Sequence, residues 1–317
     1  MPDRFEILHK DLAGRIGRLS TPHGSVETPL LMPVVNPHLP LISPEELGLM
    51  GAGMIITNSY IINQDQELRI KAIERGLHDL LGFSGPIMTD SGAFQLSVYG
   101  DIDVLPLEIL DFQFAIKSDI SVPLDIPTPP DVSRERAELE LNTTEMRLQE
   151  AASLKREVLL AGPVQGSTYP DLRERAGRFA RGLGFDLCPV GGVVPLMEAY
   201  RFRDLVDVVV AAKKGLGSGV PVHLFGAGHP MIFALAAAMG CDLFDSAAYA
   251  LYAREGRYLT VQGTRKLAEM KYLPCSCPVC QKYTHQELMD SPQRTKELAR
   301  HNLYISLQEV KLVRQSI

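Results

Sequence analysis

The sequence lacks the features that would place a protein in a membrane or outside the cell. It contains no uninterrupted apolar run of about 18 residues, the length that a membrane-spanning helix needs. No Arg-rich or charged-then-apolar leader follows Met1. Its five cysteines in 317 residues are too few and too unevenly spread for the disulfide framework of a secreted protein. We therefore expect a protein of the cytoplasm that does not contact a membrane.

The sequence also lacks an overall excess of positive charge. Its formal net charge is -6 at pH 7, which argues against a general nucleic-acid binder. The balance is uneven, because residues 254–317 hold 11 Lys and Arg against 6 Asp and Glu. This part is net positive and the remainder is net negative. We expect an anionic partner to meet the C-terminal part of the chain.

Short apolar runs rich in β-forming residues recur along the chain, with helical segments between them. The runs are continuous rather than alternating, which is typical of parallel strands that helices cover on both faces. A Ser cap precedes one helical segment at Pro44, and Gly184 closes another that starts at Pro170. The eight runs cover residues 29–35, 53–59, 86–91, 120–126, 158–166, 185–192, 220–228 and 241–246.

Eight strand-and-helix units predict an α/β fold, a (β/α)8 TIM barrel. The Gly-x-Gly-x-x-Gly of an open dinucleotide-binding sheet is missing after the first run. A β-hairpin turn is expected at residues 20–25, before the barrel. The alternation stops near Arg254, so we expect residues 1–253 to form the barrel with its N-terminal hairpin. Residues 254–317 then form a second module that ends in a helix over roughly residues 291–315.

Polar residues stand where several of the apolar runs end. In a barrel of this kind the active site lies at the C-terminal ends of the strands. An Asp after a strand can instead cap the next helix. Three carboxylates and a carboxamide at one mouth are harder to explain as caps, because clustered like charges cost energy that a functional site would justify. We predict a site formed by Asp90, Asp125, Gln165, Gly191, Gly192 and Asp245.

This residue set suits exchange at an acetal carbon. One carboxylate can attack the sugar carbon while another gives and takes the proton of the leaving group. A further carboxylate can accept two hydrogen bonds from the N1 and N2 edge of guanine, and an amide can meet O6 and N7. Backbone N–H groups of the Gly191–Gly192 turn can approach O6 because no side chain projects there.

A metal-hydrolase barrel is the contrasting interpretation. Such enzymes carry histidines at the strand ends, typically a His-x-His pair after the first strand, and this sequence offers no such pair. His223 lies in the seventh run and His229 directly follows it, and we expect both to be structural. The sequence therefore predicts no metal site in the barrel itself.

A cysteine cluster lies in the C-terminal module. Cys275, Cys277 and Cys280 form Cys-x-Cys-x-x-Cys, a spacing that favours a shared soft cation, with zinc as the first choice. A closed tetrahedral site needs a fourth ligand, and His285 and His301 compete for it. Helical periodicity places His301 on the inward side of the last helix, which favours it. The remaining two, Cys188 and Cys241, are expected to be inert core residues.

At these positions the sequence resembles the tRNA-guanine transglycosylases, and within them the archaeosine branch. The resemblance runs over nearly the whole chain, from the N-terminal hairpin to His301. It rests on the segments "TDSGAFQ", "VPLDIPTPPD", "VQGSTYPDLRERA", "HLFGAGHPM", "FDSAAYALYA" and "PCSCPVC", which begin at Thr89, Val122, Val164, His223, Phe244 and Pro274.

The resemblance implies an activity and a role for each candidate residue. Family members of this branch replace guanine at position 15 of the tRNA D-arm with 7-cyano-7-deazaguanine, the archaeosine precursor. Asp245 matches the nucleophile that attacks C1′ of the ribose, and Asp90 matches the group that handles the proton of the base. The base-recognition positions match Asp125, Gln165 and the Gly191–Gly192 turn. The structural zinc ligands match Cys275, Cys277, Cys280 and His301.

The resemblance also implies partners. Members of the archaeosine branch commonly continue into C-terminal domains that end in a PUA-type RNA-binding domain, whereas this sequence stops at Ile317. We expect the RNA-binding part to be either a separate subunit or cut from this chain, and a homodimer to be the usual assembly. Two alternatives remain at this stage: a non-catalytic tRNA-binding subunit, and a transglycosylase that acts on the wobble guanine as the bacterial enzymes do.

Overall fold

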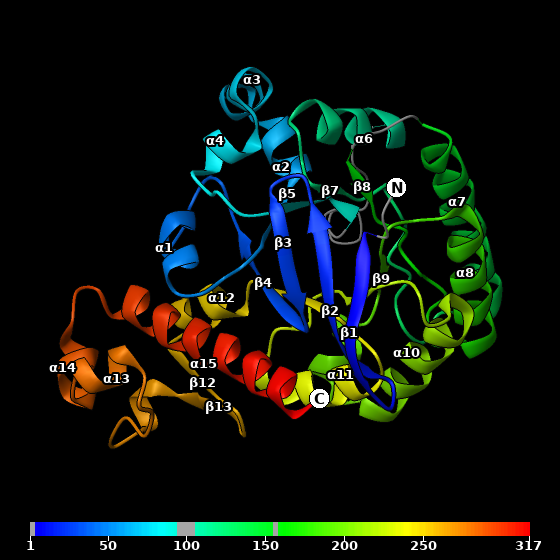
Figure 1. The fold of residues 1–317 in the computed structure, drawn as a ribbon. Coiled ribbons are helices and arrows are strands. Elements are labelled where there is room, and N and C mark those ends of the chain that lie inside the picture. The colour runs from blue at the N-terminus through cyan, green and yellow to red at the C-terminus, as the bar shows by residue number, and fades with distance from the viewer. Residues whose placement is uncertain (1–3, 94–104, 155–157) are drawn as a thin grey trace.

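The computed structural model describes residues 4–93, 105–154 and 158–317, and a parallel eight-stranded sheet forms its centre (Figure 1). Its strands follow the chain order, with the last strand paired to the first. Two isolated parallel bridges, Ala161 to Leu187 and Val164 to Val190, join the two ends of the sheet, so the barrel is closed. The strands are β4 Leu30–Val35, β5 Ile55–Asn58, β6 Ile87–Asp90, β7 Ile120–Ser121, β8 Leu159–Leu160, β9 Cys188–Val190, β10 Val222–Leu224 and β11 Leu243–Ser246.

Each of the eight predicted apolar runs contains one of these strands, which confirms the (β/α)8 barrel. Side chains alternate between two separate cores along each strand. On β5, Ile56 belongs to a cluster that fills the barrel interior, while Ile55 packs outward against the helices. Both are buried, so the strand reads as continuously apolar.

Helices cover the outside of the barrel and begin and end at identifiable residues. Ser43 accepts a hydrogen bond from the Glu46 N–H at the start of the first helix, and Gly184 closes α8 in the left-handed conformation, as expected from the sequence. The barrel helices are α1 Pro44–Leu49, α2 Ser59–Gln64, α3 Gln66–Arg75, α4 Leu77–Leu81, α6 Pro106–Ala115, α7 Arg134–Ala152, α8 Pro170–Leu183, α9 Val194–Glu198, α10 Phe202–Leu216, α11 Phe233–Ala238 and α12 Ala248–Arg254.

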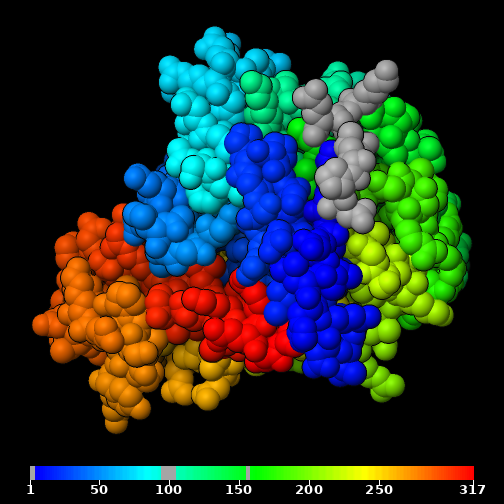
Figure 2. Space-filling model, in the orientation of Figure 1, coloured from blue at the N-terminus to red at the C-terminus, as the bar shows by residue number. Residues whose placement is uncertain are grey.

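The N-terminal part is larger than the expected hairpin. It is a three-stranded antiparallel sheet of β1 Phe5–Asp11, β2 Gly14–Thr21 and β3 Gly24–Thr28, and the predicted turn joins the last two strands. Leu19 and Val26 from this sheet belong to the core cluster of the barrel interior. The sheet therefore closes the N-terminal end of the barrel, and Figure 2 shows it in blue on the near face beside the red end of the C-terminal helix.

The C-terminal segment begins with a hairpin of β12 Arg257–Thr260 and β13 Gly263–Lys266, followed by α13 Pro278–Lys282 and α14 His285–Asp290. The long helix α15, Arg294–Ser316, then runs back along the barrel and packs on α12, α11 and β4 (Figure 1). Its bounds agree with the helix expected from the sequence. In the described part of the chain, no helix has the length and hydropathy to cross a membrane.

Candidate active site and metal centre

The predicted strand-end residues come together at the C-terminal mouth of the barrel. Asp90 ends β6 and Asp245 lies in β11, while Asp125 and Gln165 follow β7 and β8. The negative charges of Asp125 and Asp245 both help to raise the pKa of Asp90, so the three carboxylates are near neighbours. Asp125, Gln165 and Asp245 are buried or nearly so. The structure thus gathers the acidic residues that the sequence indicated.

Asp90 is held so that it can gain or lose a proton near neutral pH. Burial, followed by the charges of Asp125 and Asp245, raises its pKa to about 7, although backbone N–H groups of Gly92 and Ser91 oppose the shift. Asn58 donates from Nδ2 to Asp90 Oδ2 at 3.1 Å, and its Oδ1 caps α2 by accepting from the Ile61 N–H. This double use of the Asn58 amide fixes the orientation of the Asp90 carboxyl.

Asp245 is oriented by two hydrogen bonds on a single oxygen. His223 Nε2 donates to Asp245 Oδ1 at 2.8 Å, and the Gly226 N–H donates to the same atom at 2.8 Å. Among the described residues these donors leave Oδ2 as the oxygen that can face a substrate. Asp245 does not cap the following helix α12, because the N-cap of that helix is Ala247 and its N-terminus has no side-chain cap hydrogen bond. The capping alternative is therefore wrong for Asp245.

His223 is a candidate site residue that sequence reasoning treated as structural. It is fully buried in β10, next to β11, and its Nδ1 has no hydrogen-bond partner in the described structure. Its other ring nitrogen holds the candidate nucleophile. The only sequence signal was a histidine within an otherwise apolar strand. The second histidine, His229, fits the structural interpretation, because burial lowers its pKa to about 4 and its ring bonds Thr264.

The candidate base-reading residues form one packed unit. Gln165 Nε2 donates to Asp125 Oδ2 at 2.5 Å. A side chain on Gly191 would place its Cβ only 2.2 Å from Gln165 Nε2, so the amide lies flat against this turn. At Gly192, φ is +70° and a Cβ would come 2.7 Å from the Thr128 carbonyl oxygen. Close packing therefore requires glycine at both positions, and the positive φ is a second reason at Gly192 alone.

The Asp125 carboxyl also has a raised pKa. Burial raises it to about 6, and the hydrogen bond from Gln165 together with the charges of Arg147 and Arg173 limits the shift. A carboxylate that remains ionised near neutral pH can accept hydrogen bonds from two donors of a base. This property matches the recognition role predicted for Asp125.

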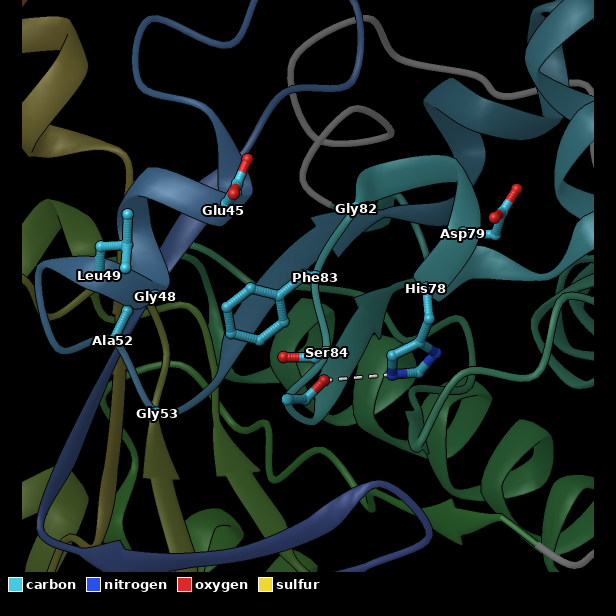
Figure 3. Close-up of a pocket in the computed structure, with 11 residues that line it drawn as sticks. Glu45, Gly48, Leu49, Ala52, Gly53, His78, Asp79, Gly82, Phe83 and Ser84 are labelled. Atoms are coloured by element: carbon cyan, nitrogen blue, oxygen red, sulfur yellow. Dashed lines mark hydrogen bonds between the residues drawn. The ribbon is translucent and has the colours of Figure 1, made fainter.

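A pocket of about 660 Å³ lies at the opposite end of the barrel (Figure 3). Gly53 and Gly85 line it, and these residues precede β5 and β6, whose C-terminal ends carry the candidate site. His78 projects into the same region and bonds the Gly85 carbonyl oxygen at 3.2 Å. The pocket is thus separated from the acidic mouth by the length of the barrel strands.

Two histidines contact the buried carboxylate of Asp119 at the same end of the barrel as this pocket. His23 Nδ1 lies 2.9 Å from one oxygen, and His78 Nε2 lies 3.0 Å from the other. Although these three residues could be grouped as metal ligands, the imidazole rings are stacked at 3.6 Å with 25° between their planes. Nearly parallel rings do not direct two lone pairs at one ion. We interpret the group as a hydrogen-bonded clamp that holds the β2–β3 turn to the barrel.

The cysteine cluster forms a group that can hold a metal ion. Ligand atoms of Cys275, Cys277, Cys280 and His301 all lie within 4.8 Å of one another. His301 Nδ1 is 3.3 Å from Cys277 Sγ and 3.5 Å from Cys280 Sγ. His301 Nε2 donates to the Leu259 carbonyl oxygen at 2.9 Å, which leaves Nδ1 with its lone pair toward the thiols. The donor set is that of a closed Cys3His site.

The positions of the two histidines show which one joins the cysteine cluster. His301 comes from α15 and points into the cluster, whereas His285 Nε2 bonds the Leu267 carbonyl oxygen at 2.8 Å. Tyr258 stacks on the His301 ring at 3.6 Å, and its hydroxyl lies 3.2 Å from Cys280 Sγ. The prediction that favoured His301 is confirmed as far as the grouping of the residues is concerned.

Comparison with known proteins agrees with this geometry. The sequence model of the family described as "Queuine tRNA-ribosyltransferase" matches residues 11–317. The chain belongs to this tRNA-guanine transglycosylase family. The resemblance on which the sequence analysis relied is therefore confirmed.

Several archaeal proteins of the transglycosylase family are similar to this chain. The tRNA-guanine(15) transglycosylase of Methanosarcina barkeri is 62% identical over 314 residues, which cover 99% of this chain and 64% of that protein. The proteins of the same name from Haloarcula marismortui and Thermococcus kodakarensis are 59% and 56% identical, with 65% and 54% of their lengths covered. The chain thus spans less than two thirds of the length of these curated relatives.

Most of the family-like segments lie in the described structure, at the mouth or in the metal cluster. The last two residues of "TDSGAFQ", Phe94 and Gln95, fall outside the described residues. Within "VQGSTYPDLRERA", Arg173 is a buried residue that the sequence analysis did not single out. The only sequence signal that could have singled out Arg173 was a charged residue on the inward side of α8.

Proposed function

We propose that this chain carries the catalytic site of a pentosyltransferase that exchanges guanine at position 15 of tRNA for 7-cyano-7-deazaguanine, in archaeosine biosynthesis. The observation that carries the proposal is the pair of carboxyl groups at the barrel mouth. Asp245 has an oxygen free of hydrogen bonds in the described structure, and nearby Asp90 has a pKa of about 7. The name shared by the archaeal relatives supports the substrate.

The two carboxyl groups divide the chemistry between them. Asp245 Oδ2 attacks C1′ of the ribose, the glycosidic bond breaks, and guanine leaves with a proton from Asp90. The incoming 7-cyano-7-deazaguanine returns a proton to Asp90 as its nitrogen attacks C1′, and the bond to Asp245 breaks. Two displacements retain the configuration at the sugar, and no ATP is needed because one glycosidic bond replaces another.

The base-reading unit holds the purine during both steps. Asp125 accepts hydrogen bonds from the N1 and N2 edge, with Gln165 and the Gly191–Gly192 turn near O6. Because Gln165 Nε2 donates to Asp125 Oδ2, a bound purine shares or replaces this contact. The target nucleotide has to leave its stack for C1′ to reach Asp245, since the D-arm is folded.

The metal centre has a structural role in this proposal. One Zn²⁺ per chain would be held by Cys275, Cys277, Cys280 and His301, and it would cross-link the segment after β13 to α15. Thiolates and a neutral imidazole are the ligands that zinc favours. The ion supplies no step at the barrel mouth.

We also propose partners on the basis of the family resemblance. tRNA, guanine and 7-cyano-7-deazaguanine are the substrates, the basic residues of 254–317 face the RNA, and the protein works in the cytoplasm as a homodimer with a PUA-type RNA-binding partner. The alternatives, a non-catalytic tRNA-binding subunit or a wobble-guanine enzyme, lack an observation that favours them. Loss of either Asp90 or Asp245 would have favoured the first, and both are present.

The test is incorporation of labelled guanine and of 7-cyano-7-deazaguanine into tRNA, followed by mapping of the modified position. We expect incorporation at position 15. For Asp245→Ala we expect the rate of incorporation to fall at least about 1,000-fold, because the covalent intermediate cannot form without its nucleophile. Asp79→Asn, an exposed carboxylate at the other end of the barrel, serves as the control. A rate from Asp245→Ala equal to that of the wild type would contradict the proposed nucleophile.

A further inference from the structure

Arg173 on α8 is a buried cation without an ion-pair partner in the described structure. Its side chain is fully buried, and its guanidinium makes two hydrogen bonds, both to backbone carbonyl groups. A buried charge of this kind is costly, and guanidinium groups usually offset the cost by pairing with a carboxylate. Burial lowers the pKa of Arg173 to about 9, and the charge of Asp125 opposes this shift. Such a residue calls for an explanation beyond helix packing.

The two carbonyl groups lie on either side of Gln165. Arg173 Nη1 donates to the Val164 oxygen at 2.7 Å, and Nε donates to the Ser167 oxygen at 2.8 Å. Between them the backbone makes a tight turn, with φ of +135° at Gly166 and +51° at Ser167. Ser167 is in a conformation that side chains rarely adopt. The guanidinium therefore fixes a strained turn at both of its ends, with Gln165 inside.

The same guanidinium reaches the glycine turn through a shared acceptor. The Val164 oxygen that accepts from Arg173 also accepts from the Gly191 N–H at 3.2 Å. A Cβ on Gly192 would lie 3.1 Å from Gln165 Oε1 and 3.6 Å from Arg173 Nη2. Within the described residues, both of these polar atoms are buried without a hydrogen-bond partner. Arg173 thus sits directly behind both segments that are proposed to read the base.

We propose that Arg173 is the positioning residue of the base-reading unit, which holds Gln165 and the Gly191–Gly192 turn in register through the carbonyl groups of Val164 and Ser167. It acts from behind Gln165 and the glycine turn and does not touch the base. This inference rests on the proposed base exchange, because it assigns a cause to the geometry of the residues that recognise the purine. A residue that only anchors α8 would make the same contacts but would not affect recognition of one substrate more than the other.

The first experiment compares Arg173→Met and Arg173→Lys with Arg178→Met, an exposed arginine on the same helix. Steady-state exchange is measured with the free base and with tRNA varied separately. We expect Arg173→Met to raise KM for the base roughly 10- to 100-fold, the loss typical of one or two charge-assisted hydrogen bonds, with KM for tRNA changed less than about twofold. Arg173→Lys keeps the charge but cannot span two carbonyl groups, so its effect is intermediate.

A double-mutant cycle tests whether Arg173 acts through Gln165. In a Gln165→Ala background the effect of Arg173→Met on KM for the base should largely disappear, because the side chain that it positions is gone. Additive effects, or a fall in kcat with KM for the base unchanged, would overturn the proposal. If Arg173→Met fails to fold, the same double-mutant cycle is measured with Arg173→Lys.

A backbone readout separates this inference from the proposed function. Amide hydrogen exchange at residues 164–167 and 189–192 should accelerate in Arg173→Met and remain unchanged in Arg178→Met. Unchanged exchange at both segments would overturn the positioning role, whether or not the enzyme is active. Absence of base incorporation by the wild-type protein would instead overturn the proposed function and leave the exchange measurement to decide the role of Arg173.

Discussion

At the scale of single residues, the candidate site is distinguished by how its carboxyl groups are held. Asp125 is buried and Asp90 is half-buried, and desolvation raises their pKa values to about 6 and about 7, with the charges of Asp125 and Asp245 adding to the shift at Asp90. Asp245 has its two donors on one oxygen. Three acidic groups close together at the barrel mouth lower the free energy of unfolding. Such a loss of stability is typical of an active site.

A stability measurement checks the raised pKa of Asp90. Because the folded pKa exceeds the unfolded value, the folded state holds the extra proton, and the wild type loses stability as the pH rises from about 4 through about 7. Asp90→Asn cannot ionise, so we expect it to be more stable than the wild type by roughly 1–3 kcal/mol at pH 8. The difference should fade toward pH 4. Chemical denaturation at both values measures it, and a gap independent of pH would contradict the assignment.

At the scale of elements, the segment after the last barrel strand depends on a few long-range contacts. Helices α13 and α14 are short, with single buried side chains at Val279 and Leu288. Such helices are marginal without further constraint. The proposed zinc link between the cysteines and His301 on α15 would supply that constraint, and the hairpin contributes Tyr258, which stacks on the His301 ring.

We therefore expect metal removal to act on this segment and not on the barrel. Chelation, or His301→Ala, should abolish the one bound zinc and increase hydrogen exchange over residues 275–290, while the barrel strands keep their protection. His285→Ala is the matched control, because this nearby histidine bonds a carbonyl group and should leave the zinc content unchanged. A metal-free segment with native protection, or loss of zinc in the control, would contradict the structural role.

At the scale of the whole molecule, the N-terminal sheet is joined to the barrel by a buried ion pair. Arg15 on β2 meets Asp242 just before β11, with Nε and Nη2 each 2.7 Å from a carboxylate oxygen. Both side chains are almost fully buried. Asp242 also accepts from the Val222 N–H, so this carboxylate connects the sheet with two neighbouring barrel strands.

Breaking this pair should destabilise the whole protein. Arg15→Met leaves the Asp242 carboxylate buried without its cation, and we expect a loss of about 3–5 kcal/mol in the free energy of unfolding. The matched control is Arg18→Met on the same strand, where the ion pair with Glu6 is exposed and contributes less than about 1 kcal/mol. Denaturant titration of the two variants measures both values. Equal losses would show that the buried pair is not what joins the sheet to the barrel.

The sequence by itself determined the class of fold and the candidate residues. Strands buried on both faces have to be apolar throughout, so eight of them could be counted, and the polar residues at the ends of several of them marked the mouth. The spacing of Cys275, Cys277 and Cys280 indicated a metal in the same local way. These features depend on residues close together in the chain, which is why a pattern could find them. The roles of the residues remain predictions.

Only the tertiary structure decided which distant side chains meet. The contact of His223 with Asp245 joins adjacent strands, and the hydrogen bonds of Arg173 depend on how α8 lies behind the Gln165 turn. The third strand of the N-terminal sheet likewise follows from packing across the molecule. Such contacts leave no local period or spacing in the sequence, because each is fixed by the geometry of the closed barrel.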